Sequence, residues 1–240
     1  MKTILIAGSS SGIGYELASL YLSKNYHVIG IARNLPSEFV KNKKYIHLKI
    51  DLKQTSNILI LSDFLKSNTY KKIEPISTSI LLSGINIVKP IIDYEDNDIQ
   101  DLFSINLLSQ IKITKELIKN HNFDRRIDFI YASSIWASSS AKYRAIYGAT
   151  KSGINGFVRN LSKEFINKSL FANYLELGWV NTPLSKRTAN DPEIKELQKR
   201  LPKENLFIPI KDIFLTIELI KSTTSFRGSS FKIDQGYSIL

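Results

Sequence analysis

Short apolar runs alternate with amphipathic stretches along the whole chain. The runs are rich in apolar residues, and they lie at residues 3–8, 26–32, 45–50, 76–84, 127–134 and 229–234, with a weaker one at 170–177. Continuous apolar strands of this length are typical of a parallel sheet that is buried on both faces. The spacing between them predicts helices at about 13–24, 56–67, 97–120, 144–167 and 211–221. The pattern therefore predicts an α/β fold built from βαβ units.

The chain reads as one domain. Its 240 residues contain no repeat, low-complexity tract or long linker, so we expect a single domain over residues 1–240. Residues 184–205 are polar and contain two prolines, unlike the strand and helix segments around them. A segment of this kind is typical of a surface insertion, and we expect it to form a lid over a substrate site.

Composition excludes several classes of site. There is no cysteine, and the three histidines are far apart in the sequence, so we expect neither a disulfide framework nor a metal site. The apolar run at the N-terminus is too short for a signal peptide or a membrane span. We therefore expect a soluble, cytoplasmic protein that does not contact membranes.

The net charge of +11 has three interpretations: a nucleic-acid partner, an acidic substrate, or a solvated basic surface in a generally lysine-rich protein. Basic residues occur in small groups with acids between them, without a zinc-finger spacing or an RNA-binding aromatic signature. We expect a solvated surface and no nucleic-acid partner. A steep fall of affinity with salt would indicate the alternative.

Three glycines follow the first predicted strand, at positions 8, 12 and 14, and a helix begins directly after them. Glycines after a buried strand permit a tight turn and let backbone N–H groups approach a pyrophosphate at the helix N-terminus. The alternative is a glycine-rich turn without a ligand. The order of strand, turn and helix at the start of a βαβ series favours a dinucleotide site.

The segment from Gly8 to Gly14, "GSSSGIG", resembles the cofactor loop of the short-chain dehydrogenase/reductase family, in its compact single-domain branch. The resemblance extends over nearly the whole chain. It implies a Rossmann-type, doubly wound parallel sheet of about seven strands, with helices on both faces in three α/β/α layers. In the loop itself it implies cofactor contacts from Gly8, Ser10, Ser11, Gly12, Ile13 and Gly14.

The end of the second strand predicts which cofactor binds. An acid there would accept hydrogen bonds from the ribose hydroxyls and repel a 2′-phosphate. Ala32 stands where NAD-using relatives keep an aspartate, and Arg33 and Asn34 follow. Since a guanidinium suits a phosphate, we predict NADP(H) in preference to NAD(H). The resemblance implies further cofactor contacts from Asp51, Leu52, Gly84, Val180 and Thr182.

Four further residues match the family's catalytic set in type, order and nearly in spacing. Tyr147 and Lys151 lie four residues apart, on one helix face, and Ser134 precedes the tyrosine by thirteen residues. Asn106 is the fourth, and it also counts among the implied cofactor contacts, as do Tyr147 and Lys151. Ser133 is the alternative serine, but the interval favours Ser134.

These residue types suit the reduction of a carbonyl group by hydride, in which the developing oxyanion needs a proton and a hydrogen-bond donor. Tyr147 would supply the proton. Lys151 would place an ammonium about 4 Å away, which at an effective dielectric of about 20 lowers the Tyr147 pKa by about 3 units before the desolvation of the ammonium is deducted. The resemblance implies that Lys151 also holds the nicotinamide ribose and that Asn106 anchors a water. We expect Ser134, Trp136 and Tyr147 to contact the substrate.

Three segments depart from the family's usual pattern. "LLSG" at 81–84 replaces NNAG, Leu177 replaces a proline, and Arg227 replaces a threonine. The first change predicts weaker support of the cofactor cleft, and the second a less rigid loop.

The sequence therefore predicts an NADP(H)-dependent oxidoreductase that interconverts a ketone and a secondary alcohol. A 3-oxoacyl compound and a sugar are the substrate types that we consider. A homodimer or homotetramer is implied by the resemblance. The alternative function is a cofactor-binding sensor or scaffold without turnover, which would predict loss of the catalytic set. Epimerase or dehydratase activity is disfavoured by the chain length and the glycine spacing.

Overall fold

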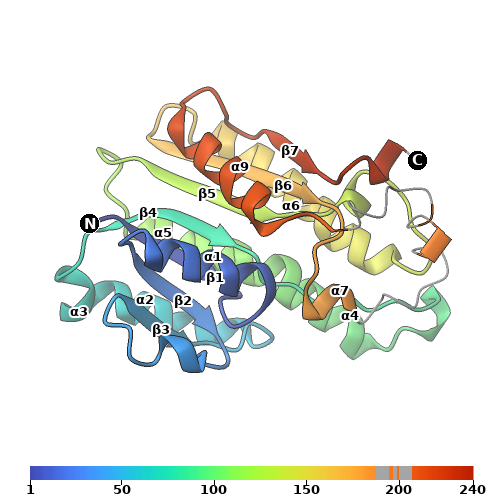
Figure 1. Cartoon of the computed structure of the whole chain (residues 1–240), viewed down its shortest axis with the longest axis horizontal. Helices are drawn as coiled ribbons and strands as arrows, with labels where there is room; N and C mark the ends of the chain where they lie inside the picture. Colours follow the sequence, from blue (N-terminus) through green and yellow to red (C-terminus); the bar gives the residue numbers. More distant parts are fainter. Residues whose placement is uncertain (187–194, 197–198, 200–206, 240) are drawn as a thin grey trace.

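The computed structural model describes residues 1–186, 195–196, 199 and 207–239. Seven strands in them form one parallel sheet, in the order β3-β2-β1-β4-β5-β6-β7 (Figure 1). The strands are β1 Thr3–Ala7, β2 His27–Ala32, β3 Tyr45–Lys49, β4 Ile76–Leu81, β5 Ile127–Ala132, β6 Leu170–Leu177 and β7 Ser230–Ile233. Each strand lies within a predicted apolar run, and the predicted doubly wound fold is confirmed.

Helices cover both faces of this sheet, as Figure 1 shows. The helices of the described residues are α1 Gly12–Ser23, α2 Leu59–Lys66, α3 Asn68–Lys71, α4 Asp96–Phe103, α5 Ser109–Lys119, α6 Ala145–Glu164, α7 Pro183–Lys186 and α9 Ile210–Ser222. One cluster of buried apolar side chains joins the sheet to α2, α5 and α6, and the other joins it to α1 and α9. Alternate residues of β1 enter the two clusters, so the central strand is buried from both sides.

The helix predicted at 97–120 is continuous but irregular. Between α4 and α5, residues Ser104–Leu108 form a π-helical turn that connects the two α-helices without interruption. A π turn adds one residue to a helical turn and often marks a functional site. The turn contains Asn106, so the irregularity lies at one of the residues that the sequence analysis selected.

The predicted lid at 184–205 lies largely outside the described residues. Its first residues belong to α7, which begins at Pro183. The prediction that this segment closes over a substrate stays a prediction.

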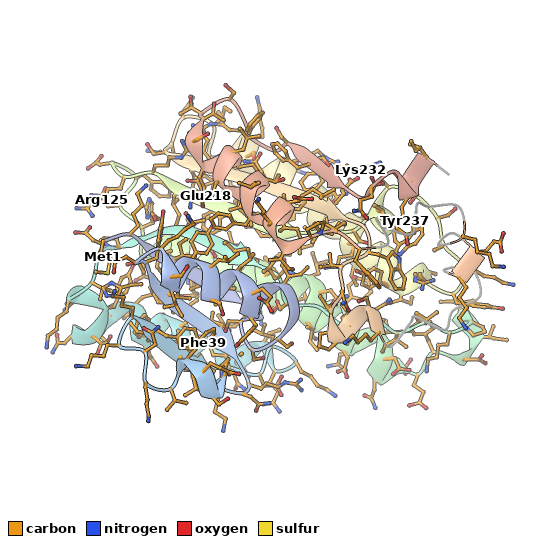
Figure 2. All side chains as sticks on the ribbon, in the orientation of Figure 1. Met1, Phe39, Arg125, Glu218, Lys232 and Tyr237 are labelled. Carbon is orange, nitrogen blue, oxygen red and sulfur yellow. The ribbon has the colours of Figure 1, made fainter. Side chains whose placement is uncertain are left out.

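A partly buried ion pair joins the sheet to α9. Arg126 donates two hydrogen bonds from Nε and one from Nη2 to the carboxylate of Asp128, at 2.8–3.2 Å, and its Nη2 also reaches the carbonyl oxygens of Ile220 and Thr223. The Asp128 side chain is only 5% exposed, and burial raises its pKa although Arg126 acts in the opposite direction. Arg125, the next residue along the chain, lies at the surface beside Met1 (Figure 2).

We predict that Arg126→Met lowers the free energy of unfolding by about 3 kcal/mol at pH 7, because it leaves a buried carboxylate without its cation. The pKa of Asp128 then rises further. Its carboxyl group takes up a proton as the pH falls, so the loss should shrink between pH 7 and pH 4. Urea denaturation at both pH values measures this.

Arg125→Met is the matched control. Its ion pair with Glu74 has both side chains about 60% exposed, so the change should cost less than about 1 kcal/mol. Equal losses in the two variants, or a loss at Arg126 that grows on acidification, would contradict this account of the ion pair.

Candidate active site

A cleft lies at the carboxyl edge of the sheet, where the strand order reverses. β1 and β4 are neighbours in the sheet. After β1 the chain continues to β2, on one side of this pair, and after β4 it continues to β5, on the other side. Loops that leave neighbouring strands in opposite directions leave a crevice between them. Two cavities occupy it, one of about 240 Å³ and one of about 120 Å³. The two cavities adjoin, because both are lined by Ile13, Leu82, Gly84, Thr182 and Leu184.

The glycine loop forms the floor of the larger cavity and leaves no room for side chains. Gly8 has φ +87°, which favours glycine, and a Cβ on Gly14 would lie 2.1 Å from the Gly8 carbonyl oxygen. Below the loop, the Ser9 and Tyr45 hydroxyls hydrogen-bond each other at 2.9 Å. In the part of the chain that the structure describes, no side chain caps the N-terminus of α1 at Ser11, and the first turn of this helix contains no acidic residue. This cradle fits the pyrophosphate of a dinucleotide.

Most predicted cofactor contacts line the cleft. Arg33, Asp51 and Leu52 line the larger cavity, Val180 lines the smaller one, and Thr182 lines both. The glycine-loop contacts also line the larger cavity, namely Gly8, Ser10, Ser11, Gly12, Ile13 and Gly14. Asn34 is exposed and lies outside both linings. Lys53, which the sequence analysis did not select, lines the larger cavity and forms an ion pair with Asp101 at 2.8 Å.

Three of the four predicted catalytic residues line the smaller cavity, namely Ser134, Tyr147 and Lys151. All three are buried, with at most 8% exposure. Lys151 Nζ donates to the Ala132 carbonyl oxygen at 2.8 Å and lies 5.8 Å from the centre of the Tyr147 ring. The predicted face shared by Tyr147 and Lys151 therefore points into the cleft.

The two candidate serines have different partners. Ser134 Oγ accepts a hydrogen bond from the Trp136 backbone N–H at 3.2 Å, and its hydroxyl is also hydrogen-bonded to Tyr147. Ser133 donates instead to Asn155 Oδ1 at 2.5 Å. Asn155 in turn donates to Glu176 at 3.2 Å. Ser134 is therefore the serine that meets the tyrosine.

Burial changes the acidity of both groups on α6. Burial raises the pKa of Tyr147, while the hydrogen bond from Ser134 and the charge of Arg144 lower it. Burial lowers the pKa of Lys151 to about 8. This desolvation opposes the effect that distance alone predicts, because it weakens the charge that Lys151 presents near neutral pH. Arg144 supplies a positive charge beside the tyrosine that the sequence analysis did not consider.

Asn106 is fully buried in the π turn, and its side chain connects three segments. Its Oδ1 accepts from the Ile85 backbone N–H at 2.8 Å, and its Nδ2 donates to the Ile85 carbonyl oxygen at 3.0 Å and to Thr150 Oγ1 at 3.2 Å. A Cβ on Gly84 would lie 3.4 Å from Asn106 Oδ1 and 3.5 Å from Lys151 Nζ. Asn106 thus fixes the loop after β4 against α6, close to Lys151. The water that we expect it to anchor stays a prediction.

Gln110 supports the same loop and was missed from the sequence. Its Nε2 donates to the carbonyl oxygens of Ser83 and Asn106, both at 3.0 Å. This contact reinforces the "LLSG" segment, where the family's asparagine is absent. A glutamine one turn after Asn106 on a predicted helix is the only sequence signal of this role.

Arg144 and Trp179 are among the residues that line the smaller cavity but were not predicted from the sequence. Trp136, which was selected, lines the same cavity, and the Arg144 guanidinium lies 5.7 Å from the centre of its ring. The described residues contain no group of three side chains suited to a metal ion. They also contain no helix that is both long and apolar enough to cross a membrane.

Several known proteins are similar to this chain in sequence or in fold. The sequence is 26% identical over 204 residues to carbonyl reductase family member 4 of Xenopus laevis, covering 84% of this chain and 83% of that protein. It is 27% identical over 237 residues to the 3-oxoacyl-(acyl-carrier-protein) reductase FabG of Buchnera aphidicola subsp. Schizaphis graminum, covering 95% and 90%. The solved structure of 4-hydroxyisoleucine dehydrogenase complexed with NADH superposes with a TM-score of 0.89 at 22% identity, over all of both chains.

The sequence profile of the family described as short chain dehydrogenase matches residues 2–193, which is most of the chain. The glycine cradle and the Ser134, Tyr147 and Lys151 side chains lie in that matched region. The chain therefore belongs to the short-chain dehydrogenase family of oxidoreductases.

Proposed function

We propose that this protein is an NADP(H)-dependent oxidoreductase that interconverts a ketone and a secondary alcohol. One observation carries the proposal. The cavity that holds Ser134, Tyr147 and Lys151 adjoins the cavity over the glycine loop, since Ile13 of that loop lines both. A substrate beside the tyrosine would therefore lie next to one end of a dinucleotide in the cleft.

When bound, the cofactor supplies or accepts the hydride. The side chains transfer the proton and form hydrogen bonds to the carbonyl oxygen. Ser134 Oγ accepts from the Trp136 N–H, and its own proton, which it shares with Tyr147 here, would turn to the carbonyl oxygen when a substrate binds. Tyr147 is protonated near neutral pH, because burial raises its pKa, and it donates its proton to the developing alkoxide. Lys151, whose pKa lies at about 8, changes charge near the working pH and can return a proton toward Tyr147.

The preference for NADP(H) rests on Arg33. It lines the larger cavity just after β2, and Ala32 precedes it in place of an acid. A guanidinium there favours an adenosine 2′-phosphate. The solved 4-hydroxyisoleucine dehydrogenase holds NADH, so similarity of fold does not itself support this choice.

The substrate that we propose is a small carbonyl compound or its alcohol. Support comes from the names of two relatives, a carbonyl reductase and a 3-oxoacyl reductase. A homodimer or homotetramer is part of the proposal. Leu215 and Leu219, half exposed on α9, support it as apolar side chains that a second copy would cover.

The second candidate is a cofactor-binding sensor without turnover. The unusual "LLSG" segment favours it, because that segment departs from the family at the cofactor cleft. The intact set of Asn106, Ser134, Tyr147 and Lys151 favours the enzyme. A screen of NADPH consumption with ketones and aldehydes separates the two, since a sensor binds NADPH and consumes none.

We predict that Tyr147→Phe lowers kcat/KM for a reduced ketone about 10²- to 10⁴-fold, because it removes the proton donor. The dissociation constant for NADPH should change little, which fluorescence titration measures. Tyr143→Phe removes a hydroxyl from a ring that is 44% exposed and should keep the activity. Full activity in Tyr147→Phe would refute the mechanism.

We predict that Arg33→Asp changes the ratio of kcat/KM for NADPH to that for NADH by about 100-fold or more toward NADH. The variant loses the phosphate partner and gains an acid that repels the phosphate. Initial rates with both cofactors measure the ratio. Lys41→Asp makes the same charge change at an exposed residue outside both cavities and should leave the ratio alone. An unchanged ratio in Arg33→Asp would show that Arg33 does not select the cofactor.

A further inference from the structure

The wall of the smaller cavity contains an arginine that the proposed chemistry does not use. Arg144 lines this cavity together with Ser134, Tyr147 and Lys151, and it is only 2% exposed. It immediately precedes α6 and stands three residues before Tyr147. An arginine is rarely buried to this degree. Its place beside the groups proposed for catalysis therefore points to a role in the cavity.

The backbone before α6 turns this arginine inward. Tyr143 has φ +63°, a left-handed conformation that is uncommon for a bulky residue. The Tyr143 side chain remains 44% exposed, while the next side chain is buried in the cavity wall. The backbone N–H of Lys89 donates to the Tyr143 carbonyl oxygen at 3.2 Å, so the loop after β4 holds this turn in place.

The position of the guanidinium is fixed by its neighbours. Nη1 donates to the Lys142 carbonyl oxygen at 3.3 Å, and the guanidinium carbon lies 5.7 Å from the centre of the Trp136 ring. A cation at this distance from an indole face is attracted by its quadrupole. The side chain is thus preorganised, which lowers the entropy cost of binding a ligand.

The charge of Arg144 acts within the cavity. Burial raises the pKa of Tyr147 and of Tyr94, and the positive charge of Arg144 acts in the opposite direction on both. The Tyr94 hydroxyl donates to the Ile87 carbonyl oxygen at 2.6 Å. Arg144 and Tyr147 line the same cavity of about 120 Å³, so a single small molecule can meet both. A planar guanidinium matches the two oxygens of a carboxylate through paired hydrogen bonds.

We propose that Arg144 binds the carboxylate of the substrate and that the substrate is a short oxo acid or the corresponding hydroxy acid. The proposal rests on the function proposed above. The cavity of about 120 Å³ is smaller than most ligand sites and suits a compound of a few carbon atoms. Arg144 would then select the substrate while Ser134 and Tyr147 meet its carbonyl oxygen.

The test compares acids with uncharged partners of the same skeleton. NADPH consumption is measured with 2-oxobutyrate, acetoacetate and levulinate and with the methyl ester of each. The wild type should favour at least one acid over its ester by tenfold or more in kcat/KM. In Arg144→Gln this preference should fall by about 10- to 100-fold, the loss expected from charge-assisted hydrogen bonds. Since the anion binds in the ground state, the change should appear mainly in KM.

Two further variants keep the test sharp. Arg144→Lys retains the charge without the fork and should give an intermediate preference. Lys142→Gln removes a positive charge from an exposed residue of the same loop and should keep the wild-type preference. A melting temperature and an NADPH dissociation constant for each variant show whether it is folded. Equal losses on acid and ester in folded Arg144→Gln, or no acid preference in the wild type, would overturn the proposal.

A binding measurement separates this inference from the proposed function. Calorimetric titration with butyrate and with butanamide, in the presence of NADP⁺, requires no turnover. Butyrate should bind more tightly to the wild type, and Arg144→Gln should abolish the difference. If no ketone is reduced but butyrate still requires Arg144, the proposed function fails and the anion site stands. If ketones are reduced and butyrate binds no better than butanamide, the function stands and this inference fails.

Discussion

The parallel pairing of seven strands is the constraint on which the rest of this protein depends. It places every carboxyl end at one edge of the sheet, and burial of the central strands on both faces fixes the pairing. At that edge the order reverses between β1 and β4, and the crevice forms there. The glycine loop, Arg33 and Ser134 each follow a different strand, yet all three line the crevice. The order and direction of the strands bring these three segments together, although they are far apart in the sequence.

Burial then sets the chemistry of the crevice. Lys151 donates to a backbone carbonyl oxygen in a site that brings its pKa to about 8, and Tyr147 stays protonated through neutral pH. The π turn between α4 and α5 brings the Asn106 side chain to the loop after β4, where it pairs with both backbone groups of Ile85. The strands and helices thus position these groups. Desolvation shifts the pKa values of Lys151 and Tyr147, and the irregular π turn sets the position of Asn106.

The sequence predicted what periodicity and residue type determine. Apolar runs located all seven strands, and the order of residue types selected the predicted catalytic residues, three of which line one cavity. The π turn was missed because one extra residue in a helical turn hardly changes the apolar spacing of 97–120. Arg144 was missed because a charged residue before a helix is usually solvated, and only the left-handed turn at Tyr143 places it inside. Gln110 was missed because its partners are backbone carbonyl groups, which leave no mark on residue identity.

The central claim is that one cleft brings a nicotinamide and a carbonyl group together for direct hydride transfer. The most direct test follows deuterium from NADPH labelled at either face of C4 into the alcohol formed from a ketone that the protein reduces. The account predicts that the alcohol carries deuterium on its new carbinol carbon from one labelled form and none from the other, because a fixed cleft presents one face. An alcohol without deuterium from either form would contradict direct transfer, and equal labelling from both would contradict a fixed cleft.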